Sequence, residues 1–127
     1  MLGSVGCSPV FTQRERLVSS FRSIASSAAE AELFLDHLQK REATSVYART
    51  YTDFLADAIR QNRQELERHP PAKGLESAFA ECQREYELLL ESVNGLKNEL
   101  NDGNALATAK TRIEVIRKTA ERSRAAL

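Results

Sequence analysis

Histidine, cysteine and paired acidic residues are the side chains of this chain that could do chemistry, but their spacing argues against most reactive sites. His37 and His69 are far apart, and Cys82 lies in an apolar pattern with helical spacing. A metal site needs several ligands at close spacing, so we predict none. Cys7 and Cys82 are placed like a loose thiol and a buried small residue, rather than like a disulfide framework.

The surroundings of His37 come nearest to a reactive site. Lys40 follows about one helical turn later, where its charge could balance a phosphoryl group. This pair is similar to the His-x-x-Lys-Gly motif of histidine phosphotransfer domains, which are also four-helix bundles. The resemblance covers those two positions, because Arg41 replaces the glycine. It implies phosphotransfer through His37, whereas a surface histidine near a helix C-terminus is the simpler interpretation.

Glutamates one helical turn apart are the other candidates for chemistry. Glu81 pairs with Glu85 in this spacing, and Glu87 with Glu91. Di-iron bundles use Glu-x-x-His motifs, which the sequence lacks, and no glycine-rich phosphate loop is present. The glutamates flank the apolar positions, so we expect them to be solvated or ion-paired. We therefore predict a protein that is not an enzyme, with no cofactor, no metal site and no small-molecule substrate.

Apolar residues spaced alternately three and four positions apart predict that helices carry these side chains. The spacing is unbroken from 75 to 100, and similar stripes run through 17–38 and 106–127. A further stripe begins at Tyr47, Tyr51 and Phe54, with Leu55, Ile59 and Leu66 on an adjacent line. The longest stripe is Leu75, Phe79, Cys82, Tyr86, Leu89, Val93, Leu96 and Leu100.

Breaks in this pattern divide the chain into four predicted helices. Pro70-Pro71 stops one helix, and the segment from Asp102 to Asn104 can end another and cap the one that follows. The apolar stripe also changes phase between 38 and 47, which places a turn near 42–45, with Thr44 or Ser45 as the N-cap. Asn94-Gly95 is expected to kink a helix without ending it. The prediction is all-α: an antiparallel up-down-up-down four-helix bundle with coiled-coil-like heptad packing, in one domain of residues 11–127. A flexible segment, 1–10, precedes helices at 11–42, 45–68, 73–101 and 104–127.

Charge is balanced over the chain but divided between its last two predicted helices. With 18 basic and 18 acidic residues, the chain lacks the excess of positive charge typical of nucleic-acid binders. The third helix is mostly acidic and the fourth mostly basic, which predicts that the two pair. An alternative is that the fourth helix contacts an anionic membrane. That face would consist of Lys110, Arg117, Lys118 and Arg124.

Two apolar triplets each occupy more of the helix circumference than a bundle core can bury. Leu33-Phe34-Leu35 and Leu88-Leu89-Leu90 each span more than half of the helix circumference, so one residue of each should stay exposed or meet another molecule. Tyr47 and Tyr51 suit an interface, because tyrosine combines an apolar body with a polar tip. The candidate interface residues are Phe34, Leu88, Leu90, Tyr47 and Tyr51.

The function expected from these features is that of an interaction or adaptor module. Its partner would be another protein or a second copy of the chain, as a homodimer. Peripheral membrane targeting is the alternative, and phosphotransfer through His37 and Lys40 is the second alternative. No apolar run is long enough to span a membrane, and we expect a cytoplasmic protein.

Overall fold

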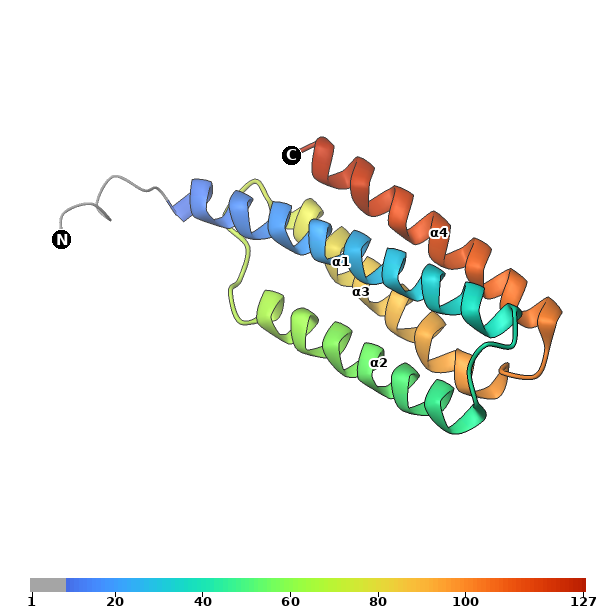
Figure 1. Cartoon of the computed structure of the whole chain (residues 1–127). Coiled ribbons are helices and arrows are strands. Elements are labelled where there is room, and N and C mark those ends of the chain that lie inside the picture. The colour runs from blue at the N-terminus through green and yellow to red at the C-terminus, as the bar shows by residue number, and fades with distance from the viewer. Residues whose placement is uncertain (1–8) are drawn as a thin grey trace.

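The computed structural model describes residues 9–127 and confirms an all-α bundle of four helices. The helices are α1 (Pro9–Gln39), α2 (Ser45–Glu67), α3 (Glu76–Gly95) and α4 (Gly103–Ala125), with a 3-10 turn, η2 (Leu96–Asn98), after α3. Successive helices run in opposite directions, and the most extensive contacts join α1 to α4 and α2 to α3 (Figure 1). Of the predicted flexible segment 1–10, residues 1–8 lie outside the described residues, as does Cys7, and Pro9 and Val10 begin α1.

The apolar stripes predicted for α1, α3 and α4 form the core. On α3 and η2, the residues from Cys82 to Leu96 that keep the stripe spacing are all buried. Four fully buried alanines, Ala28 and Ala31 on α1 with Ala109 and Ala120 on α4, let these two helices pack closely, because small side chains shorten the distance between axes. Burial of Cys82 confirms that this cysteine acts as a small apolar residue.

The inner face of α2 differs from the prediction. Tyr47 and Phe54, which were expected to begin the buried stripe, are exposed, and Tyr51 is only partly buried. The adjacent line faces the core instead: Ala48, Thr52, Leu55, Ala56, Ile59 and Leu66 are buried. Thr52 can lie inside because its hydroxyl donates a hydrogen bond of 2.7 Å to the backbone carbonyl of Ala48. The aromatic side chains of α2 are therefore available at the surface.

The ends of the helices follow local capping chemistry. Thr44 caps α2, and Asp102 caps α4 by accepting hydrogen bonds of 3.1 Å from the backbone amides of Asn104 and Ala105. At Gly95 the structure differs from the prediction: α3 ends there and a 3-10 turn follows, so Gly95 does more than kink the helix. The low helix propensity of glycine accounts for this early end.

The ionic partner of α4 is α1 rather than α3, which corrects the predicted charge pairing. Arg117 of α4 binds Glu32 of α1 at 2.6 Å, and Lys110 forms an ion pair with Asp36. Within residues 9–127, no ion pair joins α3 to α4; a hydrogen bond from Ser123 to Glu85 links them instead. No helix in the described part of the chain is both long and apolar enough to cross a membrane.

Candidate functional site: an aromatic groove between α1 and α2

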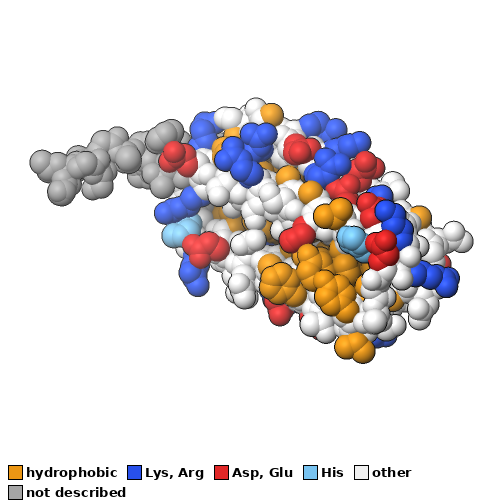
Figure 2. Space-filling view, viewed as in Figure 1, with side chains coloured by type: hydrophobic (Ala, Val, Ile, Leu, Met, Phe, Trp, Pro, Cys, Tyr) orange, Lys and Arg blue, Asp and Glu red, His pale blue; other side chains and the backbone are white. Residues whose placement is uncertain are grey.

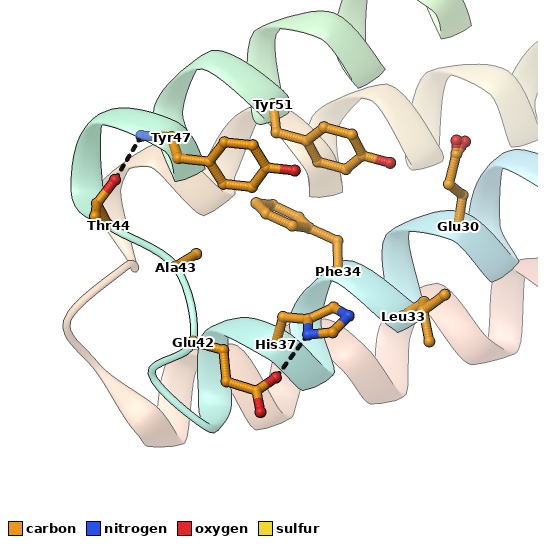
Figure 3. Close-up of a pocket in the computed structure, with 9 residues that line it drawn as sticks. All are labelled: Glu30, Leu33, Phe34, His37, Glu42, Ala43, Thr44, Tyr47 and Tyr51. Carbon is orange, nitrogen blue, oxygen red and sulfur yellow. Dashed lines mark hydrogen bonds and ion pairs between the residues drawn. The ribbon is translucent and has the colours of Figure 1, made fainter.

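A groove with a volume of about 580 Å³ lies between the C-terminal part of α1 and the N-terminal part of α2. In the space-filling view, hydrophobic side chains gather over this region beside a histidine (Figure 2). The close-up shows side chains from both helices and from the turn between them facing the same space (Figure 3). We call it the aromatic groove, and its lining residues are Glu30, Leu33, Phe34, His37, Glu42, Ala43, Thr44, Tyr47 and Tyr51.

Aromatic rings from both helices form one continuous row along the groove. Tyr47 and Tyr51 are one turn apart on α2, with ring centroids 6.0 Å apart and planes 12° from parallel. Phe34 of α1 packs under Tyr51, with centroids 4.7 Å apart, and is only 4% exposed. Phe54 continues the row beyond the groove, 6.0 Å from Tyr51. Buried Phe34 therefore supports a surface made of the other rings.

The turn between α1 and α2 closes one end of the groove. Arg41 has a left-handed backbone (φ 57°), and the amides of Arg41 and Glu42 bond to the carbonyls of Leu38 and His37. This is the Schellman pattern, which ends a helix and reverses the chain. It brings the Glu42 carboxylate to 2.7 Å from His37 Nδ1, which donates the hydrogen bond (Figure 3). The side chain of Thr44 then caps α2 by accepting from the amide of Tyr47.

Acidic groups give the groove its charge. Glu30 lies at the end away from the turn, and its carboxylate and the Tyr51 hydroxyl point toward each other (Figure 3). Partial burial and the negative charge of Glu30 raise the pKa of Tyr51 above its usual value. Two carboxylates and one histidine line the groove, and no lysine or arginine does. The groove therefore combines an apolar surface with a negative potential.

The structure places three of the five candidate interface residues in the aromatic groove: Phe34, Tyr47 and Tyr51. The triplet on α1 leaves one residue exposed, as expected, but this residue is Leu33, at 61%, while Phe34 and Leu35 are buried. Leu88 is 39% exposed on α3, and Leu90 packs partly against the core; neither lines the groove.

Sequence reasoning missed Leu33 and Phe54 as surface residues. Leu33 precedes two core residues, and which member of a triplet faces outward depends on where the other helices pack. Phe54 was assigned to the buried face of α2, but the structure places it on the exposed face. Its spacing of three positions from Tyr51 is the signal that could have assigned both residues to one exposed aromatic row.

The basic residues proposed for membrane contact are largely engaged in ion pairs. Lys110 pairs with Asp36, Arg117 contacts Glu32, Glu114 and Glu121, and Lys118 pairs with Glu114. Arg117 and Arg124 also line a shallow depression between α1 and α4 together with Arg22 and Glu121. This part of the surface mixes both signs of charge, so its basic groups do not form a uniformly positive face.

Glu85 and Cys82 are two ionisable side chains buried inside the bundle. Glu85 was expected to be solvated or ion-paired, but its side chain is only 2% exposed, and Oε1 has no hydrogen-bond partner. Burial, followed by the negative charge of the neighbouring Glu81, raises the pKa of Glu85 to about 8. Burial also raises the pKa of the Cys82 thiol to about 12, which keeps it in the unreactive thiol form at neutral pH.

Neither metal coordination nor similarity to known proteins assigns a function to the described residues. Within the residues that the structure describes, no three histidine, cysteine or acidic side chains come together as metal ligands would. Comparisons of the chain with protein-family models, curated proteins and solved structures find no match.

Proposed function

We propose that this protein is a non-enzymatic interaction module that docks another protein in the aromatic groove. The observation that carries the proposal is the exposure of three large apolar side chains at this one place: Leu33 is 61% exposed, Tyr47 57% and Phe54 62%. Single exposed apolar residues are common on protein surfaces, but a contiguous group around a concave site marks a binding surface.

Two physical properties of the groove favour tight docking. Tyrosine and phenylalanine bring a large contact area at a small cost in side-chain entropy, and buried aromatic anchors dominate many protein interfaces. Phe34 and the Schellman turn hold the surrounding residues in place before a partner arrives. A preorganised surface loses less conformational entropy on binding, so more of its contact energy appears as affinity.

The two alternative functions have weaker support. A peripheral membrane site would place anionic lipid against the groove, whose lining includes Glu30 and Glu42, or against α4, whose basic side chains are ion-paired. For phosphotransfer, the Nδ1–H bond to Glu42 leaves Nε2 of His37 as the available nucleophilic nitrogen. A phosphoryl group at His37 would, however, lie close to the negative charge of Glu42, which disfavours its formation.

We expect substitutions at the rim of the groove to abolish partner retention. The test compares tagged wild-type protein with a Leu33→Ser, Phe54→Ser double variant during isolation from the native cells. Because both residues are exposed, the variant should keep its helical circular-dichroism spectrum, while the recovered partner falls by about tenfold or more.

The matched control for this experiment is Leu88→Ser with Val115→Ser, which removes two exposed apolar residues outside the groove. The control should retain the partner at the wild-type level. Equal loss in both variants, or retention by the groove variant, would contradict docking in the groove. Sedimentation equilibrium of the wild-type chain identifies the case in which the partner is a second copy.

A further inference from the structure

We propose that the occupant of the aromatic groove is an arginine side chain, presented between apolar residues by a segment of the partner protein. This inference rests on the proposed docking function and deepens it by naming the chemistry of the partner. It follows from three properties of the groove: its carboxylates, its aromatic faces and the apolar residues on its rim.

The charge of the groove selects a cation. Glu30 is exposed and makes no ion pair among residues 9–127, so its carboxylate is available to a ligand. Glu42 at the other end shares its charge with His37, which leaves the site negative even when that histidine is protonated. An anionic or neutral occupant would cover the Glu30 carboxylate without a cationic partner, leaving only the Tyr51 hydroxyl facing it, at a cost in desolvation.

The rings provide a flat surface for a planar cation. Tyr47 and Tyr51 lie side by side with planes only 12° apart, and more than half of the Tyr47 side chain is exposed. A cation over the face of a tyrosine ring is attracted by the negative charge of the π system. Guanidinium groups stack on such faces, since they are planar and more weakly hydrated than an ammonium group.

Arginine fits the combination of ring and carboxylate better than lysine. A guanidinium that lies in the groove against the tyrosine rings can direct its N–H groups sideways to the Glu30 carboxylate, which lies next to the Tyr51 hydroxyl (Figure 3). The ammonium of lysine is a compact charge and lacks the planar fork that serves both contacts. The aliphatic part of the arginine side chain would cover Leu33, which lies across the groove from the tyrosines.

The exposed apolar residues at the rim of the groove lead us to expect apolar residues on either side of the partner's arginine. Phe54 lies next to Tyr51 on the side beyond the groove and is 62% exposed. A partner residue next to the arginine, placed further along α2, would therefore bury Phe54. Burying such a side chain favours binding through the hydrophobic effect. An arginine between two leucines is therefore the simplest probe of the site.

The test titrates the ¹⁵N-labelled full-length chain with acetyl-Leu-Arg-Leu-amide and with the same peptide carrying citrulline, which has the shape of arginine but no charge. We expect the arginine peptide to shift the amide resonances around Phe34, Tyr47 and Tyr51 and to bind about fivefold more tightly than the citrulline peptide at low salt. Glu30→Gln should reduce this preference to less than twofold. Glu87→Gln, an exposed change on α3, should leave it unchanged.

Three results would overturn the arginine proposal, and they separate it from the docking function. Equal binding of both peptides in the groove would leave docking intact but remove the cation preference. Absence of shifts with either peptide at about 10 mM, while the isolated partner still binds, would show that the partner uses other chemistry. Concentration-dependent shifts of the groove resonances without peptide would assign the groove to a second copy of this chain.

Discussion

Leu35→Ala is expected to lower the free energy of unfolding by about 2–5 kcal/mol, whereas Leu33→Ala should change it by less than about 0.5 kcal/mol. Leu35 is fully buried between α1 and its neighbours, so truncation leaves a cavity that the packed core can fill only in part. Leu33, two positions earlier, is 61% exposed and has few contacts to lose.

Urea unfolding followed by circular dichroism measures both variants against the wild type. The pair is matched because the same chemical group is removed twice from the same helix. Similar losses in the two variants would contradict the orientation of α1, and with it the position of Leu33 on the rim of the groove. A small effect of Leu35→Ala alone would show that the core is loosely packed.

Glu85→Gln is expected to remove much of the dependence of stability on pH between about 5 and 9. The raised pKa means that the folded protein keeps the Glu85 proton up to about pH 8, whereas the unfolded chain releases it near 4.5. Stability from this group is therefore fully present below pH 4.5 and is lost as the pH rises through 8. We expect the wild type to lose on the order of 3 kcal/mol across this window, and the variant to lose little.

The wild type and the Glu85→Gln variant are expected to differ most clearly in stability at alkaline pH. At pH 9 the wild type must bury a charged carboxylate or unfold locally, while glutamine at position 85 stays neutral, so the variant should be the more stable protein. Glu91→Gln, an exposed change on the same helix, is the control and should follow the wild type. Parallel pH profiles for all three proteins, measured by urea unfolding, would show that Glu85 is solvated.

Much of the fold could be predicted from apolar spacing because three of the helices carry a single dominant stripe. On α1, α3 and α4, the residues at this spacing are the ones that the core buries. On α2 the sequence holds two apolar lines, and spacing alone cannot decide between them. The line with Leu55 and Ile59 lies inside, and its small residues Ala48 and Thr52 let α2 approach its neighbours.

The candidate site could be predicted in part because its aromatic residues are unusual, while its geometry depends on tertiary contacts. Tyr47, Tyr51 and Phe34 were identified from their types and from the apolar triplet. The burial of Glu85 was missed because α3 contacts all three other helices, so its buried arc is wider than the apolar stripe. The charge pairing was misassigned because α4 contacts both α1 and α3, and net charge does not choose between them.

Site-specific photo-cross-linking tests the central claim, docking in the aromatic groove, most directly. A benzophenone amino acid would replace Tyr47 or Phe54 in turn, with replacement of Val115, an exposed apolar residue of α4, as the control. Irradiation in the native cells should yield a discrete adduct from positions 47 and 54, with one peptide of one partner identified by mass spectrometry, and no such adduct from position 115. The same adduct from all three positions, or an adduct from position 115 alone, would contradict the account.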